Sequence, residues 1–202
     1  GFTPVGPGQA TNVEPEEAIN YEAGFRYNGS IGVELIGFYS DYKNILGTCT
    51  QSSGCNVANI DQRFNGGEAE IKGVELLFST EAKAGSVRFP VKINATYTEA
   101  QFNNSFTTTL NDWGRGTVNV GDPIPYIPDW QANLTLGFIW KSFSSFINYN
   151  YMGEMADQAV ATNREFIAAR GVFDLTLRYD MTSRIQYYFK ADNITGEDYA
   201  VS

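Results

Sequence analysis

The side chains that could carry out chemistry in this chain are few. Histidine is absent, so the commonest general base and metal ligand is missing. A serine or threonine nucleophile would therefore lack its usual positioned base. The acidic residues Glu14, Glu16 and Glu17 surround a proline, and we interpret them as a solvated strand entrance rather than a catalytic pair. These observations predict that the chain is not an enzyme.

Cys49 and Cys55 are the other residues with reactive side chains. They are the only cysteines, and five residues separate them within a polar stretch. An even count in this setting predicts a small disulfide-closed loop formed in an oxidising compartment. Two free thiols are the alternative.

Charge and composition limit the possible partners and the type of membrane protein. The net charge of -9 gives no basic face for nucleic acid. Aromatic residues make up 14% of the chain, yet no run approaches the roughly 20 apolar residues that a membrane-spanning helix needs. A transmembrane β-strand needs only about 9–11 residues, and only every second side chain meets lipid. A helical membrane protein is therefore excluded, whereas a membrane β-barrel is not.

Apolar and polar residues alternate along most of the chain, which is typical of strands with one apolar face. The alternation is clearest over 87–98, whereas Ile36 and Phe38 interrupt it in an earlier strand. Another strand has Trp130 and Trp140 at its two ends, as expected for the two aromatic girdles of a membrane barrel. The predicted strands lie at about 17–27, 31–42, 67–80, 87–98, 130–140, 147–151, 173–181 and 185–191.

The connections between these strands alternate in length. Short turns are predicted at 28–29, 81–86, 141–144 and 181–184, and long polar segments at 43–66, 99–128 and 153–170. All long segments then lie at one end of the sheet, which is the asymmetry of outer-membrane barrels. The predicted fold is an all-β, antiparallel transmembrane β-barrel. A soluble β-sandwich is the alternative, but it does not require long loops at one end or strands tipped with Trp and Tyr.

Four sequence segments resemble landmarks of TonB-dependent receptors, and they occur in the family's order. They are 14–17 with 20–24 and 26–27 (EPEE, NYEAG, RY), 38–44 (FYSDYKN), 73–75 (GVE), and 192–194 (DNI) with Tyr199. A narrower resemblance, to receptors of the iron(III)-dicitrate group, rests on 2–8 (FTPVGPG), 46–55 (LGTCTQSSGC) and 64–67 (FNGG). These last motifs are loop segments, so they bear on the ligand.

The resemblance implies that residues 1–202 are part of a C-terminal β-barrel domain. Such receptors have an N-terminal plug domain and a 22-stranded barrel, of which this chain would supply eight strands, numbers fourteen to twenty-one. The plug domain and the final strand are expected to lie outside the chain. Eight strands alone would leave two open edges in lipid, which the bilayer does not tolerate.

The implied function is TonB-dependent import of a ferric chelate, either ferric citrate or a siderophore, across the bacterial outer membrane. The chelate is the transported ligand, and no resident cofactor is expected. The expected partners are the TonB-ExbB-ExbD complex, through a TonB box in the missing N-terminal part, and outer-membrane lipid and lipopolysaccharide. We expect a monomeric barrel. A complete eight-stranded structural barrel and a TonB-dependent receptor for another nutrient are the alternatives.

Ferric chelates of this kind present anionic oxygens, which suit the planar, two-pronged guanidinium group. The candidate ligand contacts are therefore loop arginines and their neighbours: Arg63, Asn65, Trp113, Arg115, Arg164, Phe166 and Arg170. Lipopolysaccharide or a neighbouring loop is the alternative partner for each of them. No residue is expected to coordinate iron directly, because the chelator already fills the metal's coordination shell.

The bridge between Cys49 and Cys55 can be tested directly in the native protein. We expect no thiol to react with an alkylating reagent until the protein is reduced, because both cysteines lie in a predicted extracellular loop. Reduction should cost about 2–3 kcal/mol of stability or less, because the closed loop is small. Two freely alkylated thiols in the unreduced protein would refute the bridge.

Overall fold

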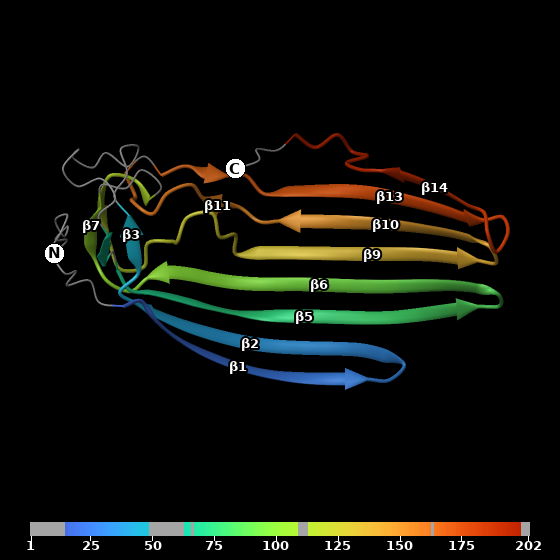
Figure 1. Ribbon diagram of the computed structural model, residues 1–202, viewed down its shortest axis with the longest axis horizontal. Helices are drawn as coiled ribbons and strands as arrows, with labels where there is room; N and C mark the ends of the chain where they lie inside the picture. Colours follow the sequence, from blue (N-terminus) through green and yellow to red (C-terminus); the bar gives the residue numbers. More distant parts are fainter. Residues whose placement is uncertain (1–14, 49–62, 66, 109–112, 163, 199–202) are drawn as a thin grey trace.

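The computed structural model describes residues 15–48, 63–65, 67–108, 113–162 and 164–198. Eight long strands form one antiparallel sheet in the order β1-β2-β5-β6-β9-β10-β13-β14 (Figure 1). Their bounds are β1 (Glu17–Asn28), β2 (Ile31–Lys43), β5 (Ala69–Ala84), β6 (Val87–Phe102), β9 (Trp130–Trp140), β10 (Phe143–Met152), β13 (Arg170–Asp180) and β14 (Gln186–Ala191). The sheet is open, with β1 and β14 at its edges, and all eight predicted strands are confirmed.

The connections separate into two ends of the sheet, as Figure 1 shows. The short turns after β1, β5, β9 and β13 form the turn end. The long connections after β2, β6 and β10 form the loop end, which contains three further two-stranded sheets: β3 (Leu46–Thr48) with β4 (Arg63–Asn65), β7 (Phe106–Thr108) with β8 (Gly116–Val118), and β11 (Met155–Ala156) with β12 (Phe166–Ile167). In the described part of the chain, no helix has the length and apolar character to cross a bilayer.

The register of the sheet separates an apolar face from a polar face. On the apolar face Leu35 lies opposite Leu76, and that residue lies opposite Ala95. On the polar face Asn94 lies opposite Asn133, and Asn133 lies opposite Asn150. Because successive residues of a strand point to opposite faces, this register carries the sequence alternation across every strand. The apolar face is the surface that meets lipid in a membrane barrel.

Aromatic residues gather near both ends of the apolar face. At the loop end, the rings of Tyr97 and Trp130 lie 5.1 Å apart between centroids. At the turn end, Trp140, Phe143, Tyr179 and Tyr187 are successive cross-strand neighbours on β9, β10, β13 and β14. Trp130 is 52% exposed and Trp140 is 45% exposed. The predicted aromatic girdles therefore match the observed sheet.

The structure differs from the prediction at the turn expected over 81–86. Strand β5 continues to Ala84, and the reversal needs only Gly85, whose φ is 59°, and Ser86. Glu81, on the polar face, accepts a hydrogen bond from Arg88 across the hairpin at 3.3 Å. Polar residues continue a strand here because they lie on the polar face, where charged side chains pair with one another.

One cross-strand contact explains two of the sequence landmarks. Phe38 lies directly opposite Gly73 on the polar face, and its ring covers the glycine. A Cβ atom at Gly73 would lie 2.6 Å from the ring atom Cζ of Phe38 and would also overlap the carbonyl oxygen of Tyr97. Covering a strand glycine with an aromatic ring restores the packing that the glycine lacks. Phe38, which interrupts the alternation of its strand, therefore has a structural role.

The DNI landmark has a local explanation as well. Asn193 follows β14 with a positive φ of 51°, which asparagine tolerates better than most residues. Its side chain donates to the carbonyl of Glu197 at 2.9 Å and accepts from the amide of Glu197 at 2.8 Å. Its own amide donates to Asp174 on β13 at 2.9 Å. The landmark therefore holds the chain against β13 where β14 ends.

Replacing Gly73 by Ala tests the contact with Phe38. We expect a loss of about 1–3 kcal/mol in the free energy of unfolding, because the backbone of β6 and the ring must both shift. Gly37→Ala is the matched control in the adjacent strand, since its Cβ would meet only the carbonyl oxygen of Ala23, at 3.9 Å. Denaturant titration of the intact protein in detergent micelles gives both values. Equal losses in the two variants would contradict the proposed role of the contact.

Candidate functional site

The long connections pack into a loop cluster with its own hydrophobic core. The fully buried members come from the ends of β5 and β6, from the β7–β8 hairpin and from the segment before β12: Ala69, Phe102, Phe106, Val118, Ala159 and Val160. Tyr42, Ile45, Trp113 and Ile124 pack against them. Together with Met155 and Ala156, the six buried residues are the buried apolar residues of the described chain, because the long strands expose one face to lipid. The loop end is therefore a folded surface.

Trp113, a predicted ligand contact, lies at the centre of this packing. Its ring is 5.4 Å from Phe102 and 5.6 Å from Phe106 between centroids, in edge-to-face arrangements. Its carbonyl accepts hydrogen bonds from the amides of Ala159 and Val160, at 3.0 and 2.9 Å. Trp113 thus joins two long connections that are distant in sequence. Ligand contact by this residue stays a prediction.

The connection before β9 runs back along β6 and extends the sheet at the loop end. The amide of Ile124 donates to the carbonyl of Ala100 at 3.1 Å, and the amide of Thr98 donates to the backbone carbonyl of Asp129 at 2.9 Å. Residues 116–128 belong to the long connection predicted over 99–128. Backbone hydrogen bonds hold this part of the connection against the end of β6.

Arg164, another predicted ligand contact, connects two long connections. Its guanidinium group pairs with Asp122 at 2.7 Å, and the side chains are only 15% and 12% exposed. The same group donates to the carbonyl of Gln158 at 3.1 Å and to that of Ala159. Sequence reasoning missed Asp122, because the two residues are 42 positions apart and no local pattern relates them. Ligand contact by Arg164 also stays a prediction.

The environment of Asp122 stabilises its charged form. Burial by itself raises the pKa of the carboxyl group. The hydrogen bonds from the amide of Asn119, at 2.7 Å, and from Arg164 outweigh burial, so the pKa of Asp122 lies below its usual value. The carboxylate is therefore charged at neutral pH, as the ion pair requires.

Arg115, a further predicted ligand contact, is exposed between two glycines that pack closely on the neighbouring connection. Gly114 has a φ of 80°, and a Cβ there would lie 3.0 Å from the Cβ of Val160. A Cβ added at Gly116 would lie 3.1 Å from the Cγ1 atom of the same valine. The glycines thus allow close packing of two connections and present Arg115 at the surface.

An open hollow of about 590 Å³ lies on the polar face below the loop cluster. Arg170, at the start of β13, lines it together with Asn94, Gln131, Asn150 and Asp174. Its floor is a ladder of amides, in which Asn133 donates to Asn150 at 2.5 Å and Asn150 donates to Asp174 at 3.2 Å. Among the candidate residues, Arg170 therefore lies nearest to a surface that could contact a polar ligand.

The other predicted ligand contacts lie in separate segments of the loop end. Phe166, in β12, is 58% exposed. Arg63 and Asn65 belong to β4, which pairs with β3. Cys49 and Cys55 lie outside the described residues, so their bridge stays a prediction. The loop end thus collects the candidates that the structure describes, without joining them in one pocket.

Comparison with known proteins identifies the family. A family model described as "TonB dependent receptor-like, beta-barrel" matches residues 1–194. The chain belongs to this family. Members are receptors of the outer membrane and not enzymes, so the predicted location and the absence of an enzymatic role are both confirmed. No curated protein matches the sequence.

Solved structures of receptor barrels have the same fold. The chain aligns with the ferric yersiniabactin uptake receptor FyuA from Yersinia pestis at 20% identity and a TM-score of 0.69, over 91% of this chain and 26% of that one. The pyoverdine receptor FpvA from Pseudomonas aeruginosa PAO1 has 19% identity and a TM-score of 0.65, over 98% and 29%. The ferric citrate transporter FecA has 17% identity and a TM-score of 0.66, over 93% and 28%. At these identities the likeness shows the fold alone, and the chain spans under a third of each barrel protein.

Asp122→Asn in the intact receptor tests the ion pair that joins the connections. We expect amide hydrogen exchange in 119–129 and 157–164 to become faster, corresponding to about 1–3 kcal/mol, because the guanidinium group loses its charged partner. Glu154→Gln, an exposed change in the connection that contains Arg164, should leave exchange unaltered.

The same pair predicts a dependence on pH. Because the folded pKa of Asp122 is lowered, its stabilisation is complete above the unfolded value of about 3.9 and is lost as the pH falls through the lower folded value. The difference in local stability between Asp122→Asn and the parent, measured by hydrogen exchange, should therefore stay constant from about pH 5 to 8. It should shrink only in stronger acid. A difference that already shrank near pH 6 would contradict this assignment.

Proposed function

We propose that the intact receptor imports a ferric chelate across the outer membrane. The family match carries this proposal, because it assigns the chain to TonB-dependent receptor barrels. The likeness to barrels that take up yersiniabactin, pyoverdine and ferric citrate supports it at the level of the fold. Energy would come from the TonB-ExbB-ExbD complex through a part of the protein beyond this chain. This chain would contribute ligand capture at the loop end and a polar wall for the passage.

The finer proposal concerns the ligand, which we take to be a ferric carboxylate chelate of the citrate kind. Its support is the resemblance of 2–8, 46–55 and 64–67 to the iron(III)-dicitrate group. An anionic chelate that approaches a chain of net charge -9 needs locally placed cations to overcome the unfavourable long-range potential. Arg115, exposed at the loop end, and Arg170, in the hollow on the polar face, are such cations.

The order of these two arginines suggests a route. Arg115 belongs to the loop cluster and would meet the chelate first. Arg170 lies where β13 enters the sheet and would receive it below. In the same hollow, the amides of Asn133 and Asn150 add uncharged hydrogen-bonding groups, and the neighbouring Asp174 opposes tight binding of an anion. Weak, successive contacts of this kind favour passage over trapping.

Titration of ferric citrate against the intact receptor and its Arg115→Ala variant, at fixed salt, tests the ligand assignment. We expect the variant to bind about 1–3 kcal/mol more weakly, because a charge-assisted hydrogen bond is lost. Arg115→Lys should recover only part of the loss, since lysine lacks the two-pronged geometry.

Lys43→Ala is the control, because it removes an exposed cation from the loop end of β2. It should leave the affinity unchanged. Equal affinities of Arg115→Ala and the parent would remove Arg115 from the site. An absence of saturable binding to the parent would overturn the citrate assignment and favour another nutrient, while the barrel family would be unaffected.

A further inference from the structure

The apolar face ends in a continuous aromatic row at the turn end. Trp140 lies opposite Phe143, which lies opposite Tyr179, and Tyr179 lies opposite Tyr187. These residues occupy four adjacent strands at one height. Amphipathic rings at such a position mark the boundary between acyl chains and lipid headgroups. Whatever lies just beyond this row therefore lies among the headgroups.

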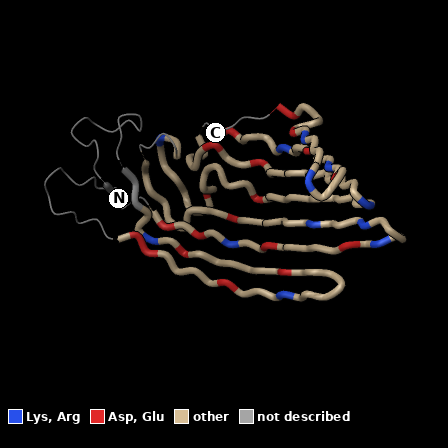
Figure 2. Tube along the Cα trace, turned by 45° about the vertical axis from the view of Figure 1, so that its right-hand side comes forward, with Lys and Arg blue, Asp and Glu red and all other residues tan. Residues whose placement is uncertain are grey.

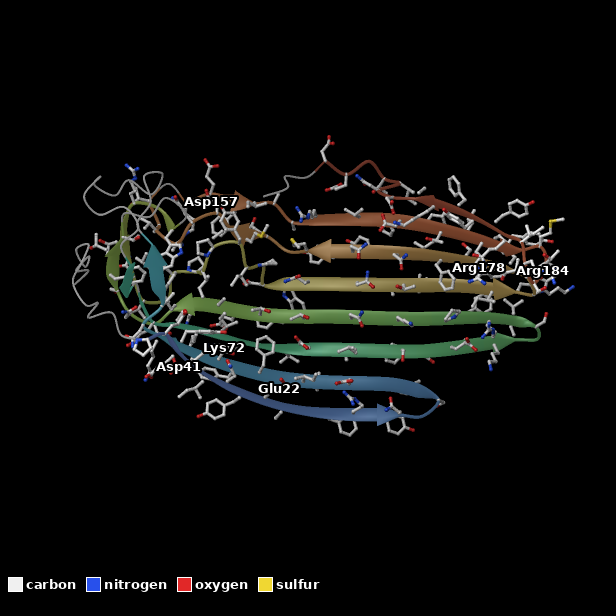
Figure 3. The ribbon with its side chains drawn as sticks, in the orientation of Figure 1. Glu22, Asp41, Lys72, Asp157, Arg178 and Arg184 are labelled. Carbon is white, nitrogen blue, oxygen red and sulfur yellow. The ribbon has the colours of Figure 1, made fainter. Side chains whose placement is uncertain are left out.

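Two cations without acidic partners lie at this boundary. Lys141 follows Trp140 in the turn to β10, and its ammonium nitrogen lies 4.8 Å from the centre of the indole ring. Arg184 lies in the turn between β13 and β14, at the tip of the turn end (Figure 3). In the described part of the chain neither side chain forms an ion pair, whereas nearby Arg178 pairs with Asp180 at 3.0 Å. Both cations can therefore bind an anion from outside the protein.

The other end of the apolar face has the opposite charge. Beyond the loop-end aromatics, Lys72 lies opposite Glu99 and pairs with Glu70 and Glu99, each at 3.0 Å. Glu70 lies opposite Asp41, a further carboxylate on this face. Lys72 is therefore already bound to two acids. Figure 2 shows the same distribution of charge along the molecule, with Lys and Arg concentrated toward the turn end and Asp and Glu toward the loop end.

We propose that Lys141 and Arg184, above the aromatic row of the turn end, bind the phosphate groups of anionic phospholipids in the leaflet that surrounds the short turns. The ammonium group of Lys141 lies over the indole ring of Trp140, which keeps it at the level of the lipid headgroups. A zwitterionic phosphatidylethanolamine neutralises its own phosphate, but phosphatidylglycerol does not. Cations at a membrane surface attract anionic headgroups over neutral ones. This inference depends on the family's place in the membrane and is independent of the cargo.

Quenching of Trp140 by brominated lipids measures this preference at the site. The intact receptor is placed in vesicles that contain both phospholipids, with bromine on the acyl chains of one or the other. The Trp140 signal is the difference between the receptor and its Trp140→Phe variant. We expect phosphatidylglycerol to be favoured at Trp140 by about two- to fivefold, and the preference to fall in high salt.

Trp130 provides a matched control, because it lies on the same face beside the acidic end. The Trp130 signal is the difference between the receptor and its Trp130→Phe variant. This signal should show no preference for phosphatidylglycerol. The double variant Lys141→Gln, Arg184→Gln should abolish the preference at Trp140, and Lys141→Arg with Arg184→Lys should keep it. Equal quenching of Trp140 by both lipids would overturn the proposal, and so would a preference that survives the glutamine variant.

Discussion

The structure depends on one constraint, which is that every backbone amide and carbonyl within a bilayer must bond to a neighbouring strand. This constraint requires an unbroken register from β1 to β14. Successive side chains point to opposite faces, so this register places every second residue on lipid. A shift by one position would exchange the two faces. The aromatic rows, the ring of Phe38 over Gly73 and the amide ladder from Asn133 to Asn150 all follow from this single alignment.

The sheet was predictable because lipid imposes a simple pattern. Alternation of apolar and polar residues identified all eight long strands, and the lengths of the connections identified the two ends. The prediction was wrong over 81–84, where residues that include Glu81 and Lys83 were assigned to a turn although they continue β5. Ile36 and Phe38 obscured the pattern for the converse reason, since the polar face also contains apolar residues. Phe38 fills the space at Gly73, which no local pattern reveals.

The loop end was predicted less well, because its order comes from contacts between distant segments. The strands there have only two or three residues each, too few for a periodic signal. Trp113 and Arg164 were selected for their chemistry, which suits either a ligand or a folded interior. The structure shows that each already makes contacts within the protein, Trp113 with Phe102 and Arg164 with Asp122. Burial and pairing of this kind depend on tertiary structure and cannot be derived from residue type.

The hydrophobic core of the loop cluster has a thermodynamic consequence for recognition. Phe102, Val118 and Val160 hold together the described parts of the connections after β6 and β10 before any partner arrives. A molecule that docks on this surface therefore does not meet the entropic cost of ordering the cluster, a cost that is largest when a loop must fold on binding. A larger share of the free energy of each contact then appears as affinity. A cavity made in that core would weaken recognition at a distance, without altering a single atom that a partner touches.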